Sequence, residues 1–481
     1  MKGAWVLLEP VVSSYPLVSQ QEYYNSPNAE GSCGAPVPTS TPRAPFSSSM
    51  KFPNEDRPSV TLITEYFYPE EASTAQLLTS LATGLQGDFD VSVLTGRPNY
   101  HAGDETESVP ARETHEGVSI ERLPATRLDK DTLPFRVVNW ITFTLLVFWR
   151  LVRSRGSDDV ALVLSNPPIL PLAAWAAKRV CGLSYAYLIY DMYPDFPVAL
   201  GMISKDSIIV RGWGRVMEMV YRDADRIVVL GESMKQRLTS KMERDPAFSP
   251  GKVEVIPNWE DGSFITPRPK CKNPFAQEEG LTGSFTLLYS GNIGRFHELR
   301  TAIDAIGRLE ERDRDDIEFV VIGEGARKEE HQRYVERRGI RNVRFLPFQP
   351  MDRLPETLTA CDASLVGIIP EVEGMCVSSK LYSALAAGRP ILAVVGEGDE
   401  VARTVREHDC GAYVRPGDAE AAAETLAEWA DNTARSEALG QRARMTLKEN
   451  YTRSRAVDAY AALFNRMHDR RCPLNTTRGD R

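Results

Sequence analysis

The sequence predicts an α/β protein with two Rossmann-like, doubly wound domains that face a cleft. Three observations lead to this prediction. Apolar strand-like segments alternate with helical segments along most of the chain, which is typical of a parallel sheet covered on both faces. The alternation stops between Trp259 and Gly283, where Pro, Gly and Lys residues follow no period, and then restarts. The length of 481 residues is sufficient for two hydrophobic cores.

The elements follow one another in a regular order in both halves. In the first half we expect strands at 59–64, 90–96, 118–124, 159–165, 185–191, 224–231 and 252–258, and helices near 74–85, 171–179, 209–222 and 233–241. In the second half we expect strands at 285–291, 317–323, 343–348, 363–368 and 390–395, and helices near 297–308, 326–338, 400–407, 419–432, 436–450 and 454–468. Ligands of such sheets bind beyond the carboxyl ends of the strands.

The domain boundaries follow from these patterns. We expect an N-terminal extension at 1–58, a first domain at 59–262, a linker at 263–283, a second domain at 284–450, a helix at 451–468 that packs back on the first domain, and a tail at 469–481. The extension is rich in Ser, Pro, Gly, Asn and Thr, which predicts disorder. We expect Met50 to be the true start of the protein. The alternative is a genuine flexible tail.

Composition excludes several other classes of protein. Charged residues make up 26% of the chain and hydrophobic residues 42%, as in soluble globular proteins. The net charge of -9 argues against a nucleic-acid-binding protein. The seven cysteines are scattered and form no Cys-x-x-Cys pair, which favours reduced thiols in the cytoplasm over disulfides or a zinc site.

The segment Ser378–Leu392 carries the strongest signal for a binding site. Ser378 and Ser379 are suitable helix N-caps, and Lys380 adds a positive charge beside the unpaired N–H groups that begin a helix. This combination is typical of a phosphate or diphosphate site. The alternative is an ordinary capped core helix with a solvated lysine.

Three further loops are expected at the same edge of the second sheet. One contains Gly291, Asn292, Gly294, Arg295 and His297, the second Gly323 and Gly325, and the third Phe348. Glycines allow a ligand to approach the backbone closely, and the basic side chains offer charge and hydrogen-bond donors. Each loop alone is a weak signal, but together with Lys380 they predict a site for a nucleoside diphosphate.

At this point the chain resembles a known family. The stretches ITEYFYPEEASTAQ, VLTGRPNY, VVLGESMKQRL, VIPNWED, LLYSGNIGRFHEL, VVIGEGARKE, VRFLPFQPMDRLP and SSKLYSALAAGRPIL are similar to those of retaining GT-B glycosyltransferases of glycosyltransferase family 4, in the surface-polysaccharide branch. The resemblance covers residues from about 59 to 467. It implies that the second domain binds a sugar nucleotide and the first domain an acceptor.

The resemblance also implies roles for individual residues. Lys380 and Arg295 would stabilise the diphosphate, and Asp191 would lie beside the reacting anomeric carbon. The other expected donor-binding residues are Gly291, Asn292, Gly294, His297, Gly323, Gly325, Phe348, Ser379, Leu381, Tyr382 and Ser383. Thr74, Gln76 and Glu373 are further candidates, for the acceptor or for another part of the site. The alternative for Asp191 is a cap or turn residue before Pro194.

One departure from the family concerns a pair of glutamates. The family typically has Glu-x7-Glu, whose second glutamate binds the ribose, but Met375 and Ser383 occupy the two positions here. Glu373 lies two residues early and is either a shifted remnant or a loop residue. A serine hydroxyl can still bond a ribose hydroxyl, although with less charge assistance. The departure affects the identity of the donor more than the reaction class.

The expected reaction moves a hexose or N-acetylhexosamine-type sugar from a nucleoside diphosphate to an acceptor, with retention of configuration. Preorganised positive charge would stabilise the leaving diphosphate, so no cofactor or metal is expected. Two other functions remain open. One is a GT-B-fold sugar-nucleotide epimerase, and the other is a non-catalytic GT-B partner subunit.

The segment Leu133–Val152 suggests where the acceptor is found. Its apolar run carries Trp140 and Trp149, and arginines flank it. Its uninterrupted part is too short for the ~20 residues that span a bilayer. We therefore expect an interfacial helix on the cytoplasmic face of the membrane and a polyprenyl-linked or other glycan acceptor. The alternative is a core helix of the first domain.

Overall fold

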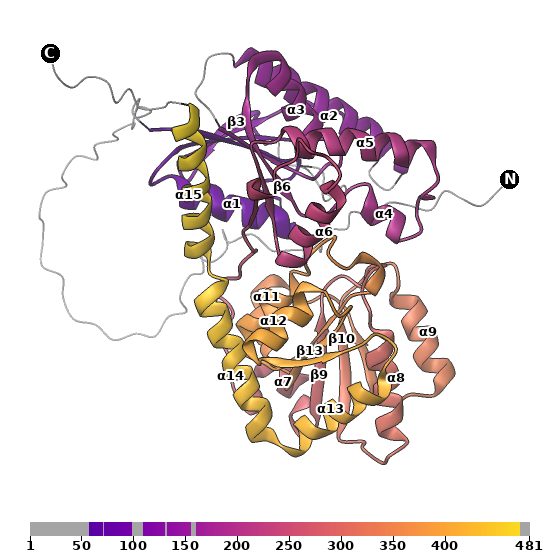
Figure 1. Ribbon diagram of the computed structural model, residues 1–481. Helices are drawn as coiled ribbons and strands as arrows, with labels where there is room; N and C mark the ends of the chain where they lie inside the picture. The colour runs from indigo at the N-terminus through magenta and orange to yellow at the C-terminus, as the bar shows by residue number, and fades with distance from the viewer. Residues whose placement is uncertain (1–56, 71, 99–108, 130–131, 155–159, 472–481) are drawn as a thin grey trace, which may run out of the picture.

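The computed structural model describes residues 57–70, 72–98, 109–129, 132–154 and 160–471, and it contains two domains that are each built on a mainly parallel sheet (Figure 1). Met50, nearly all of the expected N-terminal extension and most of the expected tail lie outside the described residues. The N-terminal domain precedes the segment near Trp259, and the C-terminal domain follows it. This arrangement agrees with the predicted fold class.

The N-terminal domain contains an eight-stranded sheet in the order β3-β4-β2-β1-β5-β6-β7-β8. The strands are β1 (Ser59–Ile63), β2 (Asp90–Thr95), β3 (Arg112–His115), β4 (Val118–Arg122), β5 (Val160–Leu164), β6 (Ser184–Ile189), β7 (Arg226–Val229) and β8 (Val253–Val255). The central strands β1 and β5 are buried almost throughout, because helices cover both faces of the sheet.

Strand β3 was not predicted from the sequence. It pairs antiparallel with β4 at the edge of the sheet, and the two strands are joined by a turn at Glu116 and Gly117 that has positive φ at both residues. Its sequence, Arg-Glu-Thr-His, is polar and half-exposed. An edge strand needs no apolar run, so the hydrophobic pattern gives no signal for it.

The helices of the N-terminal domain are α1 (Ser73–Leu85), α2 (Leu133–Arg153), α3 (Pro171–Cys181), α4 (Asp195–Ala199), α5 (Ile208–Asp223) and α6 (Glu232–Met242). Helices α2 and α3 pack against each other along the outer side of the domain (Figure 1). Helix α6 begins where β7 ends and lies at the boundary with the second domain. The loops after β1, β6 and β7 therefore face the C-terminal domain.

The C-terminal domain contains a six-stranded parallel sheet in the order β11-β10-β9-β12-β13-β14. The strands are β9 (Phe285–Ser290), β10 (Ile317–Ile322), β11 (Val343–Leu346), β12 (Ala363–Gly367), β13 (Ile391–Val394) and β14 (Gly411–Val414). Renumbered within the domain, this is the dinucleotide-binding order 3-2-1-4-5-6, in which the strand order reverses between β9 and β12. The loops after these two strands are therefore placed to form a binding site.

The helices of the C-terminal half are α7 (Pro274–Glu278), α8 (Arg300–Glu310), α9 (Lys328–Arg338), α10 (Leu354–Thr359), α11 (Lys380–Ala387), α12 (Glu400–His408), α13 (Ala419–Asp431), α14 (Thr433–Asn450) and α15 (Arg453–Arg471). Helix α7 lies within the segment that the sequence predicts to be a linker. Asn273 caps it by accepting a hydrogen bond from the Ala276 N–H, and Phe275 is buried in a small cluster of the second domain. Capping and a single aromatic anchor therefore order this short segment.

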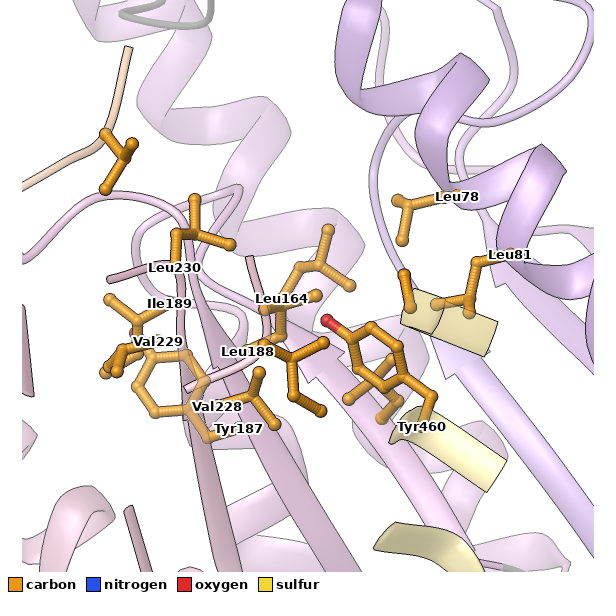
Figure 2. Close-up of a cluster of buried hydrophobic side chains, with 14 of the residues drawn as sticks. Leu78, Leu81, Leu164, Tyr187, Leu188, Ile189, Val228, Val229, Leu230 and Tyr460 are labelled. Carbon is orange, nitrogen blue, oxygen red and sulfur yellow. The ribbon is translucent and has the colours of Figure 1, made fainter. Parts of the chain in front are cut away.

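Helix α15 returns from the second domain to the first and packs against α1 (Figure 1). Tyr460 points from this helix into the core of the N-terminal domain, close to Leu188 and Leu81 (Figure 2). The guanidinium of Arg453, the first residue of α15, donates hydrogen bonds to the Ser80 carbonyl of α1. The end of the chain is thus part of the first domain's core.

Several hydrogen bonds join the two domains directly. The Met192 N–H donates to the Met375 carbonyl at 3.0 Å, and the Ser233 N–H donates to the Glu400 carboxylate at 3.0 Å. Phe196 of the first domain packs edge-on against Phe296 of the second, with ring centroids 5.6 Å apart. These contacts bring the end of β6 and the loop after β12 to one interface.

Candidate active site

Lys380 is the first residue of α11 and lies between β12 and β13 in the chain. Its side chain is 4% exposed, and its Nζ lies 3.2 Å from the His297 Nε2 and 5.2 Å from the centre of the Tyr289 ring. In the described part of the chain, no carboxylate forms an ion pair with it. Burial lowers the pKa of the Lys380 ammonium to about 7. The solvated-lysine alternative is therefore wrong.

The start of α11 differs from the expectation in its hydrogen bonding. Ser379 is at the N-cap position but has helical dihedral angles and makes no side-chain capping bond. The N–H groups of Leu381 and Tyr382 donate to the Ser378 and Ser379 carbonyls in a tight first turn. The expectation of free donors is wrong for these two groups, so the charge of Lys380 contributes more to an anion site than the helix end does.

His297 is held in one orientation beside Lys380. Its Nδ1 accepts a hydrogen bond from the Gly294 N–H at 2.9 Å, and its side chain is 1% exposed. Burial, and then the neighbouring charges of Lys380 and Arg327, lower the pKa of the His297 imidazole well below its usual value. The ring is therefore neutral, with its proton on Nε2. His297 lies in the loop before α8, whereas the sequence predicted that it begins the helix.

The glycine loops after β9 and β10 pack tightly against each other. Gly323 and Gly325 have φ values of 145° and 149°, and a Cβ atom on them would lie 2.0 Å from the Gly291 carbonyl oxygen and 2.5 Å from the Asn292 Oδ1. Any side chain would separate the two loops. These glycines are thus required by the contact between the loops, which supports the backbone beside His297, and their contact with a nucleotide stays a prediction.

Arg295 and Phe348 lie on the same set of loops. Arg295 is half-buried, and its Nε is shielded from solvent without a hydrogen-bond partner in the described structure. An unsatisfied guanidinium nitrogen is costly unless a ligand completes its hydrogen bonding, so this atom favours an anion nearby. Phe348 is half-buried two residues after β11, and its contact with a base stays a prediction.

Asp191 lies two residues beyond β6, at the interface between the domains. Its side chain is 7% exposed, and burial raises the pKa of the carboxyl to about 7. Its carboxylate forms no ion pair within the described residues. Burial, and then the Asp191 carboxylate, raise the pKa of the Cys376 thiol in the other domain. The residues next to them are joined directly, because the Met192 N–H donates to the Met375 carbonyl at 3.0 Å. Helix α4 begins at Asp195 with Pro194 at its N-cap position, so Asp191 is not a helix cap.

Glu65 was not singled out from the sequence, although it lies two residues beyond β1 on the same sheet edge as Asp191. Burial and the nearby Glu70 raise the pKa of the Glu65 carboxyl to about 8, while Arg136 acts in the opposite direction. Its Oε2 is buried and has no hydrogen-bond partner among the residues that the structure describes. The available signal was its position after the first strand, which is where polar groups of such folds meet ligands.

The acceptor-side candidates fall into two places. Thr74 is buried in the first turn of α1, and the Gln76 N–H in the same turn donates to the Ala72 carbonyl. Glu373 lies apart from them at the domain interface, where its carbonyl accepts a hydrogen bond from the Arg237 guanidinium at 2.9 Å. Its carboxylate lies against Gly396, on which a Cβ atom would be 2.0 Å from the Glu373 Oε2.

Ser383 and Tyr382 contact the segment that joins the domains. The Ser383 hydroxyl donates to the Glu260 carboxylate at 3.0 Å, and the Tyr382 ring packs edge-on against Tyr451 at 5.3 Å. Burial raises the pKa of the Glu260 carboxyl. The position that the family gives to a glutamate thus carries a hydroxyl bonded to a glutamate from another segment. No local pattern indicates this pair, because its members are 123 residues apart in the chain.

Two further observations concern the surroundings of the site. A cavity of about 460 Å³ lies in the N-terminal domain between the sheet and the ends of α2 and α3, and it contains none of the predicted site residues.

Among the described residues, no group of three or more His, Cys, Asp or Glu side chains is arranged to hold a metal ion. Metal independence itself stays a prediction.

Comparison with known proteins defines the class and then the family. Residues 272–446 match the family described as glycosyl transferases group 1, and residues 74–259 match the glycosyl transferase 4-like domain. HepE from Anabaena, solved in complex with UDP-glucose, superimposes with a TM-score of 0.62 at 13% identity over 85% of this chain and 99% of its own. Such a likeness shows the fold, which is the GT-B fold.

Two relatives extend the comparison. WcaI of Escherichia coli K12, a glycosyl transferase named for colanic acid biosynthesis, is 35% identical over 313 residues, which are 62% of this chain and 74% of WcaI. WbjE of Pseudomonas aeruginosa, which is named as a probable glycosyltransferase, is 28% identical over 336 residues, which are 70% of this chain and 82% of WbjE. The chain belongs to the group 1 glycosyltransferases, and it is an enzyme of that class.

Proposed function

We propose that this enzyme transfers a hexose or N-acetylhexosamine-type sugar from a nucleoside diphosphate to a lipid-linked glycan during assembly of a cell-surface polysaccharide. The observation that carries the proposal is the buried Lys380, with which no carboxylate of the described residues forms an ion pair. Arg295, in the loop that also carries His297, has an Nε without a hydrogen-bond partner in the described structure. Two basic side chains that form no ion pair within the described part of the chain, at a sheet switch point, are suited to a diphosphate. HepE, which has the same fold, is solved with UDP-glucose.

The chemistry follows from the charges on the two sides of the interface. Negative charge develops on the diphosphate as the sugar–phosphate bond breaks, and Lys380 and Arg295 would stabilise it. This charge stabilisation needs no metal ion, and we propose that the reaction is metal-independent. The reaction releases the nucleoside diphosphate and joins the sugar to a hydroxyl of the acceptor, whose proton passes to the leaving phosphate.

Asp191 would act at the sugar from the side of the N-terminal domain. We propose retention of configuration, as in glycosyltransferase family 4, by attack on the same face from which the diphosphate leaves. With a pKa of about 7, the Asp191 carboxyl can accept a hydrogen bond from the acceptor hydroxyl or support positive charge at the anomeric carbon. Glu65, on the same edge of the sheet, would bind another acceptor hydroxyl.

The exposed apolar face of helix α2 supports the proposal that the acceptor lies at a membrane. Among the described residues, α2 is the helix whose length and composition would allow it to cross a bilayer. In the structure it instead lies on α3, with Phe143 and Val147 buried and Ile141, Leu145 and Trp149 exposed on another face. Trp149 is 59% exposed. We propose that this face rests on the cytoplasmic surface of an anionic membrane, with Arg153 beside it.

The proposed pathway rests on the two relatives. WcaI is named for colanic acid biosynthesis, and WbjE is named as a glycosyltransferase. Both matched family descriptions also name transferases, so they favour transfer over the epimerase and the non-catalytic subunit that the sequence left open.

One incubation separates the three functions. The purified enzyme is mixed with radiolabelled sugar nucleotides and polyprenyl lipids extracted from a bacterium, and the products are separated into lipid and nucleotide fractions. Label in the lipid fraction supports the proposal. A changed sugar on the nucleotide, formed without lipid, would identify an epimerase. No change with any donor would favour the non-catalytic subunit. A chelator added to a parallel reaction tests whether transfer needs a metal.

A further inference from the structure

The Lys380–His297 contact allows only one distribution of protons. The Gly294 N–H donates to the His297 Nδ1 at 2.9 Å, so this nitrogen carries no proton. A neutral imidazole then has its proton on Nε2. This N–H points at the Lys380 Nζ, which lies 3.2 Å away.

An ammonium group has only donors, so a charged Lys380 would place two N–H groups against each other. An uncharged amine has a lone pair that can accept the proton of Nε2. The geometry is therefore satisfied when Lys380 is uncharged. The depressed pKa values of both groups, which burial causes, agree with this arrangement.

The other groups around the pair oppose an uncharged Lys380 only weakly or favour it. The face of the Tyr289 ring, 5.2 Å from the Nζ, offers a weak attraction to a cation. On the other side of His297, the Arg327 guanidinium donates to the His297 carbonyl at 3.4 Å and adds positive charge. Arg295 adds another cation from the same loop. In the described structure no carboxylate forms an ion pair with Lys380 that would hold it in its charged form.

We propose that Lys380 is uncharged in the free enzyme and takes up one proton when the diphosphate of a sugar nucleotide binds, and that His297 is the positioning residue that keeps the amine in its uncharged form. The inference rests on the proposed diphosphate site. A buffer acid gives its proton to the lone pair of the amine, and the hydrogen bond from Nε2 to the amine breaks. The new ammonium and the freed Nε2–H can then both donate to phosphate oxygens.

This arrangement couples the positive charge to the substrate. A buried ammonium without a counter-ion is costly, and the free enzyme avoids that cost by leaving Lys380 unprotonated. The charge forms only when the diphosphate arrives to compensate it. Sugar-nucleotide binding should therefore be linked to proton uptake above neutral pH.

The test is isothermal titration calorimetry of the full chain with UDP-glucose, followed by a panel of other UDP-, GDP-, dTDP- and ADP-sugars. Each titration is repeated in two buffers of different ionisation enthalpy, because the difference in heat reports the number of protons exchanged. We expect uptake of about one proton at about pH 8 and little at about pH 6, on either side of the pKa of free Lys380. The diphosphate of a sugar nucleotide has no ionisation of its own in this range.

Three variants locate the proton. In Lys380→Met the uptake should disappear and binding should weaken. In His297→Gln the carboxamide oxygen can accept a hydrogen bond from an ammonium, so Lys380 becomes charged in the free enzyme and uptake should fall by more than half. The matched control is His331→Gln, since His331 is also buried in this domain but lies on α9 without contact to Lys380. Its uptake should equal that of the wild type.

The outcomes separate the inference from the proposed function. A sugar nucleotide that binds at about pH 8 without buffer-dependent heat overturns the proton uptake and leaves the diphosphate site intact. Uptake that persists in Lys380→Met also overturns the inference, because the proton then belongs to another group. If no sugar nucleotide binds, the proposed function fails and the inference fails with it.

Discussion

The two domains present opposite chemistry to their common interface. The C-terminal domain contributes the cationic side chains Lys380 and Arg295, whereas the N-terminal domain contributes the carboxyl groups Asp191 and Glu65. Burial moves the pKa of Lys380 down to about 7 and those of Asp191 and Glu65 up to about 7 and 8. In each case burial disfavours the charged form. Lys380, Asp191 and Glu65 are therefore buried groups whose uncharged forms are favoured before a substrate binds.

The hydrogen bonds that position Lys380 differ from those that position Asp191. Lys380 is positioned by a chain of hydrogen bonds through His297 to Gly294, on loops that pack tightly against each other. The Asp191 N–H donates to the Ser165 hydroxyl at 3.3 Å, but among the described residues the Asp191 carboxylate has no comparable partner. The adjacent Met192 N–H donates to the Met375 carbonyl of the other domain. The leaving group is always a diphosphate, so a rigid site around Lys380 suits it. The site around Asp191 would complete its hydrogen bonds only when the acceptor is bound.

The largest expected effect is loss of the cationic side. Lys380→Ala should lower the transfer rate by about 10³-fold, because preorganised charge at the leaving group contributes several kcal/mol to transition-state stabilisation. Circular dichroism should show a folded protein. Lys448→Ala, an exposed lysine on α14, is the matched control and should transfer normally. Equal rates for the two variants would remove Lys380 from the mechanism.

Loss of the carboxyl side should have a smaller effect. Asp191→Asn keeps the size of the side chain but not its charge, and we expect transfer to fall by about 10²-fold while the affinity for the sugar nucleotide is unchanged. Asp206→Asn, an exposed carboxyl of the same domain, is the control. If donor affinity falls instead of the rate, Asp191 belongs to the donor site and the division between the domains is wrong.

The depressed pKa of Lys380 predicts how stability changes with pH. The unfolded chain holds the lysine proton up to about pH 10.5, whereas the folded protein releases it above about pH 7. The unfolded state therefore binds more protons between these values, so this residue makes the free energy of unfolding rise with pH by about 1.4 kcal/mol per unit. Lys380→Met should remove this slope in urea titrations of the ligand-free enzyme. Parallel pH profiles for wild type and variant would show that the folded lysine keeps an ordinary pKa.

The smallest effect concerns the outer side of the N-terminal domain. Replacing Ile141, Leu145 and Trp149 together by Ser should reduce flotation with anionic vesicles several-fold, because each exposed apolar side chain contributes only modestly to binding at the interface. Met445→Ser removes an exposed apolar side chain of the C-terminal domain and should float like the wild type. Equal flotation of all three proteins would show that α2 does not attach the N-terminal domain to a membrane.

Local patterns were sufficient to find the buried strands, the second domain's glycine loops and the lysine at the start of α11. Period and composition act within a few residues, so such features can be recognised without knowledge of the fold. The same reasoning missed β3 and β14, which are short and only half-buried. The sequence pattern also predicted a linker around α7, because one helix cap and one buried aromatic ring are too weak a signal to predict a helix.

The sequence by itself determined the fold class, the division into two domains, the place of Lys380 at the start of a helix and that of Asp191 just beyond a strand. Alternating apolar segments and turn residues encode these features locally. Only the tertiary structure decided which side chains meet. Lys380 faces His297 from 83 residues away, Ser383 faces Glu260, and Glu65 joins Asp191 on one edge because of the order of strands in the sheet. Protonation states depend on burial and on neighbours distant in the chain, so they follow from packing and not from sequence position.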